Sequence, residues 1–192
     1  FRAKGHEAFS CDLPGVTAGG LYPQYHLTGD YRLFVNDGWD MLIGHPDCTY
    51  LCSSGLHWNK RVPGRQQLTN AALDFVREMM DLPIAKIAIE NPIGCISTQI
   101  RRPDQIIQPY EFGDDASKRT CLWLKGLPPL PLDPAARFAG RHVIDPKTKK
   151  IVERWSNQTD SGQNRLGPSD RRAADRAVTY AGIARAMADT WG

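Results

Sequence analysis

Two apolar stretches, each closed by a polar turn, set the architecture of this chain: Trp39-Asp-Met-Leu-Ile-Gly-His-Pro-Asp-Cys-Thr49 and Ile84-Ala-Lys-Ile-Ala-Ile-Glu-Asn-Pro92. Short apolar runs that end at turn residues are typical of buried strands. Between them, apolar side chains recur at helical spacing, which predicts an amphipathic helix over Arg65–Asp81. A strand, a helix and a strand in this order favour an open α/β sheet, whose ligands bind outside the carboxyl ends of the strands.

Further elements are expected on both sides of this unit. A short strand ending at Asp12 is expected near the start, and Thr120–Leu124 has the pattern of another buried strand. His142–Asp145 and Lys150–Arg154 flank a turn and predict a hairpin. We expect a final helix capped by Ser169. Its apolar face would carry Ala173, Ala177, Tyr180, Ala184, Met187 and Trp191.

Length and composition predict one ordinary folded domain over residues 1–192. The chain is 41% hydrophobic and 23% charged, which suffices for a core. A net charge of +3 permits an anionic partner without requiring one. The apolar runs are far shorter than the ~20 residues of a membrane span, so no membrane contact is expected. Five cysteines without a regular spacing indicate reduced thiols in a cytoplasmic protein.

Acidic residues follow three of the expected strands. Asp12 ends the first, Asp30 follows Gly29, and Glu90 ends the run Ile84–Ile89. A carboxylate at the carboxyl end of a strand can accept hydrogen bonds from a ribose, as in dinucleotide-binding folds. An aspartate after a glycine is more often a turn residue, so none of the three defines a site by itself.

Cys48 is the thiol best placed for chemistry. It follows Gly44-His-Pro directly after a predicted strand, which would expose it on a turn at the ligand-binding edge. A cysteine nucleophile needs such exposure together with a lowered pKa. The alternative is a small buried hydrophobic residue, which is the usual role of a free cysteine. We expect that role for Cys121, and also for Cys11 and Cys95.

The same stretch does not predict a metal site. His45, Cys48, Cys52 and His57 could supply four ligands. Zinc sites usually combine two compact ligand pairs, whereas here a single Cys-x-x-x-Cys pair stands alone. A zinc deaminase would need His-x-Glu and Pro-Cys-x-x-Cys, and the sequence has neither motif.

Basic residues occur in short clusters, most of which are expected to be solvated: Arg101-Arg102, Lys118-Arg119, Lys147–Lys150 and Arg171-Arg172. Lys118 and Arg119 differ because they precede a buried strand near the expected ligand-binding edge. Trp58, Trp155 and Tyr110 could stack on bases, although single aromatic residues more often belong to a core or its rim.

Four segments follow the motif order of one enzyme family. Gly29-Asp-Tyr31 resembles a Gly-Asp-Ile segment, and Asp40–Gly55 is similar to a strand with a Gly-Gly-Pro-Pro-Cys-Gln turn and a Phe-Ser-x-x-Gly loop. Ile89-Glu-Asn-Pro92 resembles a Glu-Asn-Val motif. Phe112-Gly113 and Lys118–Gly126 are similar to a Gln-x-Arg-x-Arg segment and the strand after it. In these features the chain resembles the DNA cytosine-5 methyltransferases, in the small form encoded by bacteriophages.

The resemblance implies an α/β fold of the Rossmann-like class I S-adenosylmethionine-dependent methyltransferase type. Residues 127–168 would form a reduced target-recognition region. The cofactor would be S-adenosyl-L-methionine, with Asp12 on its ribose and Asp30 on its adenine. Gly44 and Pro46 would line the same cofactor site.

The resemblance also assigns catalytic roles. The Cys48 thiolate would add to C6 of a cytosine in DNA, while Glu90 would hydrogen-bond N3 and the exocyclic amine. Lys118 or Arg119 would contact the pyrimidine carbonyl or a phosphate. The enzyme would work in the cytoplasm of the host cell if a phage encodes it.

The chain departs from the family pattern at several positions. The glycine-rich Phe-x-Gly-x-Gly loop is absent, as expected of a chain truncated at its start. Asp47 replaces the second proline, and its carboxylate would raise the pKa of Cys48 unless it points away. Thr49 replaces the glutamine, and Lys118 and Thr120 stand where two arginines are expected.

Two other functions therefore stay open. One is a non-catalytic relative that binds DNA, cofactor or a host protein, and the other is a pyrimidine-modifying enzyme that transfers a different one-carbon group. Residues 127–168 are too few to build a platform for reading several bases. The predicted hairpin carries Arg141, Lys147, Lys149 and Lys150, which suit phosphate contacts, so little sequence selectivity is expected.

Overall fold

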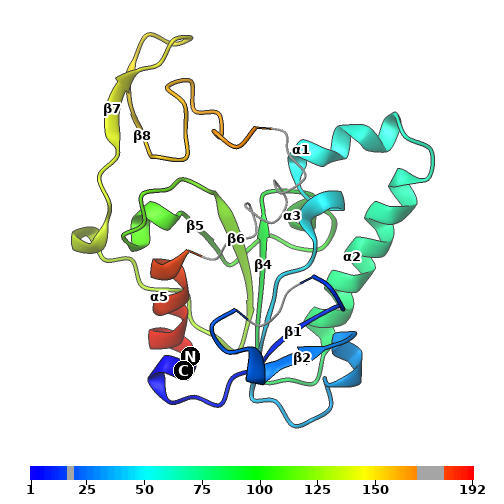
Figure 1. The fold of residues 1–192 in the computed structure, drawn as a ribbon. Coiled ribbons are helices and arrows are strands. Elements are labelled where there is room, and N and C mark those ends of the chain that lie inside the picture. Colours follow the sequence, from blue (N-terminus) through cyan, green and yellow to red (C-terminus); the bar gives the residue numbers. More distant parts are fainter. Residues whose placement is uncertain (17–19, 168–179) are drawn as a thin grey trace.

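The computed structural model describes residues 1–16, 20–167 and 180–192. Its centre is a four-stranded sheet in the order β3-β4-β6-β5 (Figure 1). The strands are β3 (Met41–Gly44), β4 (Lys86–Pro92), β5 (Gln105–Ile107) and β6 (Thr120–Lys125). β3 and β4 run parallel, whereas β6 is antiparallel to both β4 and β5. The predicted α/β class is confirmed at this level.

The parallel pair is joined by the longest described helix, α2 (Arg65–Asp81). Its ends are those that the sequence predicts, because Gly64 adopts a left-handed conformation before it and Pro83 follows it. The described residues also form three shorter helices: α1 (Ser53–Leu56), α3 (Ile96–Gln99) and α5 (Ala181–Trp191). Among these residues no helix has the length and apolar character needed to cross a membrane.

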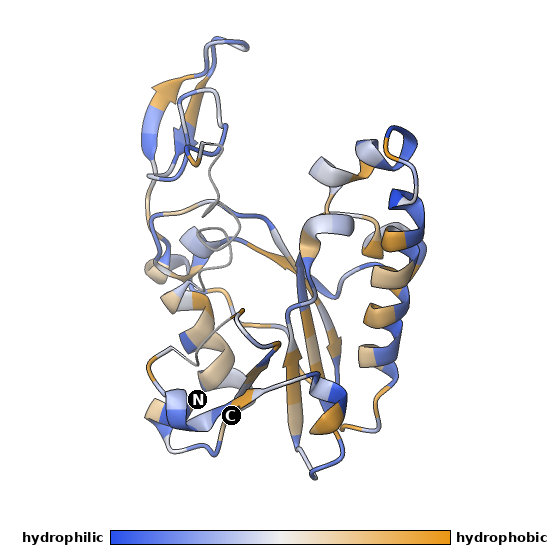
Figure 2. Ribbon diagram, turned by 45° about the vertical axis from the view of Figure 1, so that its right-hand side comes forward, coloured by the Kyte–Doolittle hydropathy of each residue, from blue (hydrophilic) through white to orange (hydrophobic). Residues whose placement is uncertain are grey.

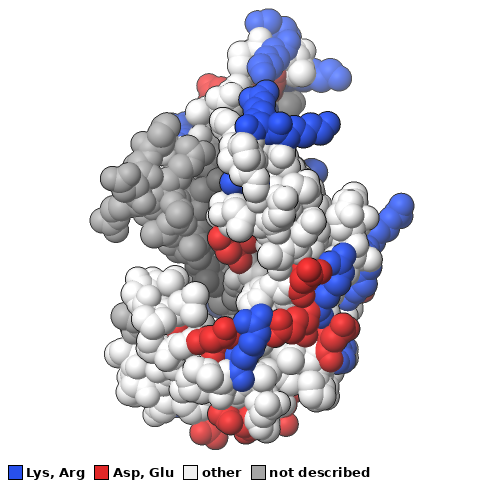
Figure 3. All heavy atoms as spheres, turned by 90° about the vertical axis from the view of Figure 1, so that its right-hand side faces the viewer, with Lys and Arg blue, Asp and Glu red and all other residues white. Residues whose placement is uncertain are grey.

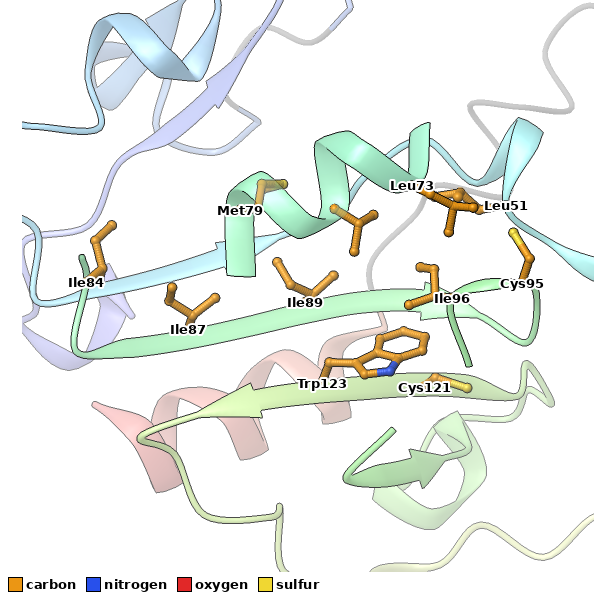
Figure 4. Packing of buried hydrophobic residues seen from close by; sticks show 11 residues of the cluster. Leu51, Leu73, Met79, Ile84, Ile87, Ile89, Cys95, Ile96, Cys121 and Trp123 are labelled. Atoms are coloured by element: carbon orange, nitrogen blue, oxygen red, sulfur yellow. The ribbon is translucent and has the colours of Figure 1, made fainter. Parts of the chain in front are cut away.

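Helices cover both faces of the central sheet. Ile87 and Ile89 of β4 pack with Val76 of α2 in one buried cluster, part of which Figure 4 shows. Ala88, which points to the opposite face, packs with Met187 of α5 in a second cluster. Because β4 is buried on both faces, its sequence is a nearly continuous apolar run rather than an alternating one. The orange strands between the helices in Figure 2 show the same arrangement.

Two small sheets stand apart from the central one. β1 (Ser10–Asp12) and β2 (His26–Thr28) form a parallel pair, and β7 (Arg141–Ile144) and β8 (Ile151–Arg154) form the predicted hairpin. The prediction that Cys11 is buried is wrong, because it lies exposed in β1. A two-stranded sheet of three-residue strands cannot cover both of its faces.

Single turns of 3-10 helix lie in many of the connections: η1 (Arg2–Lys4), η2 (Pro23–Tyr25), η3 (Tyr31–Leu33), η4 (Cys48–Tyr50), η5 (His57–Lys60), η6 (Pro109–Phe112) and η7 (Pro134–Ala136). The predicted cap Ser169 and the first part of the predicted final helix, with Ala173 and Ala177, lie outside the described residues. Within the described part of that helix, Met187 and Trp191 are buried as expected.

Candidate functional site

The candidate site lies where β3 and β4 end side by side. Gly44 pairs with Ile89 in the parallel register, so the turn after β3 lies next to Glu90 and Asn91. Gly44 is buried, and a Cβ atom there would come closest to Met79 Cε of α2 and within 2.9 Å of Ile89 Cδ1. Glycine at the end of the strand therefore leaves room for these two side chains between the sheet and α2.

A buried asparagine fixes the turn to β4. Asn91 is 1% exposed, and its Nδ2 donates to the backbone oxygen of Pro46 over 2.7 Å. Its Oδ1 is buried without a hydrogen-bond partner among the described residues. The sequence assigns no role to Asn91. The one available signal is a polar side chain near the end of an otherwise apolar strand.

Glu90 is the most buried acid of the site. Its side chain is 18% exposed, and Oε2 lies 2.8 Å from His45 Nδ1. Burial raises the pKa of Glu90, but the His45 hydrogen bond and charge, with Lys118 and Thr120, together lower it below its ordinary value. The carboxylate is thus held ionised. The sequence predicts no pairing of His45 with Glu90.

The two predicted basic residues are placed differently. β6 runs antiparallel to β4, so the start of β6 lies beside the end of β4. Lys118 acts on the Glu90 carboxylate from there. Arg119 is exposed, and its charge acts on Cys121 and Tyr110 instead. The structure therefore brings Lys118, and not Arg119, to Glu90.

Cys48 opens the 3-10 turn η4 and is half-buried. Asp47 caps this turn, and its Oδ1 accepts hydrogen bonds from the Thr49 backbone N (2.9 Å) and from Thr49 Oγ1 (2.7 Å). The two residues that depart from the family pattern on either side of Cys48 are therefore partners of each other. Their bonds hold one oxygen of the Asp47 carboxylate within the turn.

The turn is also anchored from outside. Arg65 of α2 donates to the Thr49 backbone oxygen over 3.0 Å, and Cys95 N donates to the Leu51 oxygen over 2.9 Å. Gly94 lies so close to this segment that a Cβ atom would come within 2.8 Å of Cys52 Cα. The loops after β3 and β4 are thus joined backbone to backbone.

The predicted cofactor acids lie at the ends of the neighbouring strands β1 and β2. Asp12 pairs with Thr28 in the parallel register, and Asp30 comes two residues later. Asp12 Oδ1 accepts from Leu13 N over 2.9 Å. Asp30 caps η3 by accepting from the backbone N of Arg32 (3.0 Å), and its other oxygen binds the Arg32 guanidinium (2.9 Å).

Apolar side chains accompany these two acids. Leu13, next to Asp12, is 54% exposed, and Leu33 in the turn that Asp30 caps is 73% exposed. Acceptor oxygens beside exposed apolar groups suit a ligand that has both a hydroxyl-bearing part and a flat ring.

The remaining candidates are the possible metal ligands and the aromatic residues. Among the described residues no cluster of three or more His, Cys, Asp or Glu side chains could hold a metal ion. Tyr110 and Trp155, considered for stacking on bases, stack on each other with ring centroids 3.9 Å apart. Trp58 is 45% exposed, beside the ring of His57.

Comparison with models of known protein families and with curated protein sequences gives no match to this chain.

Proposed function

We propose that the site belongs to an α/β enzyme with a cysteine nucleophile, and that the chain is an S-adenosylmethionine-dependent methyltransferase acting on C5 of cytosine in DNA. The observation that carries the proposal is the register of β3 and β4, which brings the Cys48 turn and the Glu90 carboxylate to one edge of the sheet. The proposal includes a Rossmann-like class I fold. The helical crossover between these parallel strands supports that fold.

The residues at this edge suit addition to a pyrimidine. C5 of cytosine is a poor nucleophile until C6 bears a substituent. The Cys48 thiolate would form a bond to C6, and the electron pair of the C5–C6 double bond would move towards C5. S-adenosylmethionine, when bound, supplies the methyl group that C5 takes up. A base then removes the C5 proton, the C5–C6 double bond re-forms, and the Cys48 thiolate leaves.

Glu90 and its partners would orient the base. An ionised carboxylate accepts a hydrogen bond from the exocyclic amine of cytosine. His45 contacts Glu90 and has a side chain that is 54% exposed. An imidazole N–H of His45 can donate a hydrogen bond to N3 as charge develops on the ring. Lys118 adds positive charge beside the same carboxylate.

The acids at the ends of β1 and β2 fit the cofactor by their chemistry. Asp12 has an oxygen, Oδ2, with no hydrogen bond among the described residues and can accept from a ribose hydroxyl. Asp30 can accept from an adenine amine while it still binds Arg32, because a carboxylate offers about four lone-pair positions. Leu13 and Leu33 would pack against the adenine ring.

Two observations favour the second candidate, a catalytically weak relative that acts as a DNA- or protein-binding module. His45 occupies an oxygen of Glu90 that the base would need, and Asp47 lies next to Cys48 in sequence. Transfer of another one-carbon group remains a variant of the covalent mechanism.

DNA that contains 5-fluorocytosine tests the proposal, in the presence of S-adenosylmethionine. Fluorine cannot leave as a cation, so the enzyme should remain bound to the methylated base. A denaturing gel and intact-mass measurement should show a protein–DNA adduct carrying one added methyl group. Cys48→Ala should abolish the adduct, whereas the control Cys52→Ala should keep most of it. An adduct in Cys48→Ala, or none in the wild type, would refute the proposed chemistry. An adduct without the methyl group would show that Cys48 adds to the base but that S-adenosylmethionine is not the donor.

A further inference from the structure

The two faces of the hairpin of β7 and β8 differ in their contacts. Arg141 and Arg154, which pair across the strands, lie on one face, where Arg141 is exposed and Arg154 is half-buried. Arg141 binds Asp160 over 2.5 Å, and Arg154 binds Asp145 over 2.9 Å. These two arginines are therefore engaged within the protein. The sequence-based expectation that Arg141 serves a phosphate finds no support in its contacts.

The opposite face presents an apolar pair near the turn. Ile144 and Ile151 are cross-strand partners, and they are 66% and 73% exposed. They lie next to the turn, at the end of the hairpin that extends past the edge of the sheet where β3 and β4 end (Figure 1). Two isoleucines side by side in water contribute little to folding. Their position suits contact with a partner.

The turn between the strands is basic and well ordered by its own hydrogen bonds. Asp145 Oδ1 accepts from Lys147 N (2.9 Å) and Thr148 N (2.8 Å), and its backbone oxygen accepts from Lys149 N (2.9 Å). Lys147, Lys149 and Lys150 are all exposed. Asp145 is the only acid between Ile144 and Ile151. Its carboxylate accepts hydrogen bonds from the turn and from Arg154. Figure 3 shows basic side chains gathered at this end of the molecule.

Lys149 has a left-handed backbone conformation, with φ of 60°. It is the only described residue other than glycine with a positive φ. Glycine or asparagine adopts this conformation with less strain. A lysine here costs backbone energy, and together with Lys147 and Lys150 it makes the turn basic.

We propose that the end of this hairpin binds duplex DNA, with Lys147, Lys149 and Lys150 on the phosphates and Ile144 and Ile151 against the base edges of the minor groove. Phosphates match the lysines in charge, and proteins that bind the minor groove often place apolar side chains against a base step. The inference rests on the proposed function for the choice of DNA as the partner. It adds a docking element outside the residues proposed for catalysis, and one that reads groove shape rather than sequence.

Fluorescence anisotropy with a labelled duplex tests the lysines. Affinity is measured between about 50 and 200 mM salt, where each phosphate contact contributes about 0.9 to the slope of log K against log salt. The triple variant Lys147→Gln, Lys149→Gln, Lys150→Gln should lower the slope by about 2.7. Lys86→Gln, which removes one exposed charge at the opposite end of β4, is the control and should leave the slope unchanged.

Lys149→Gly separates binding from folding. Glycine relieves the left-handed strain, so the thermal midpoint should stay equal or rise, while the salt slope falls by about 0.9. Ile144→Ser with Ile151→Ser should keep the slope and weaken duplex binding about tenfold. The same variant should lose the fluorescence change of a 2-aminopurine placed at the contacted step.

The outcomes separate this inference from the proposed chemistry. If the lysine and isoleucine variants lose duplex binding, the inference stands even where no Cys48 adduct forms. Unchanged duplex binding in both variants would overturn it, and so would no duplex binding by the wild type. If the isoleucine variant instead only converts a dimer to a monomer in sedimentation, the apolar pair joins two copies of the chain and the inference is wrong. Circular dichroism and the thermal midpoint check that the variants stay folded, whether or not an adduct forms.

Discussion

Replacing Asn91 with alanine should both destabilise the protein and loosen the Cys48 turn. The substitution removes the 2.7 Å hydrogen bond from Asn91 Nδ2 and leaves the buried oxygen of Pro46 without that donor. Removing one partner of a buried hydrogen bond costs about 1–3 kcal/mol, because the other partner is left unsatisfied. We therefore expect the free energy of unfolding to fall by about 1–3 kcal/mol, at the lower end if loss of the unpartnered Asn91 Oδ1 offsets part of the cost.

Urea denaturation measures this loss, as a lower midpoint at an unchanged slope. Asn70→Ala is the matched control, since Asn70 is exposed on α2 and accepts only from Gln66 there. Its effect should stay within about 0.5 kcal/mol. Alkylation of Cys48, followed by peptide mass spectrometry, should be faster in Asn91→Ala. A loss below about 1 kcal/mol with unchanged alkylation would show that Asn91 does not hold the turn.

Four further predictions concern the acids and the target. The pKa of Glu90 lies below its ordinary value, so the ionised carboxylate stabilises the fold above the unfolded pKa of about 4.3. This stabilisation is lost as the pH falls through the folded pKa. Acid titration followed by circular dichroism should therefore show a shallower dependence of stability on pH in Glu90→Gln. The same variant should slow methylation by about 10²–10⁴, measured by transfer of a labelled methyl group. Asp30→Ala should weaken S-adenosylhomocysteine roughly tenfold in calorimetry, and equal affinity would remove Asp30 from the site. Bisulfite sequencing of treated plasmid should show a context of one or two bases, whereas a strict longer palindrome would contradict the small recognition region.

The sequence was informative wherever local pattern decides structure. Arg65–Asp81 is helical from end to end as its periodicity predicts, and the hairpin strands lie within a residue or so of their expected bounds. The β3 and β4 strands were located, and the order of their polar turns placed Cys48 and Glu90 at one edge. In each case a run of residues and its flanking glycine or proline carry the information.

Contacts between residues far apart in the sequence could not be predicted in this way. His45 meets Glu90 across 45 positions of sequence, and Asn91 reaches Pro46 across the same interval. Both follow from the register of the two strands, which the apolar pattern does not specify. The exposure of Cys11 was missed for a related reason, because the pattern shows a strand but not how small its sheet is.

The joined loops after β3 and β4 bear on how this edge of the sheet would meet a ligand. With Asn91, Gly94 and Arg65 all holding the Cys48 turn, little conformational freedom is left there to lose on binding. A target would meet a surface already shaped for it, and the entropic penalty of ordering would fall on the target. Residues that surround the Cys48 turn could then change the preference for a partner over evolutionary time without disturbing the turn itself.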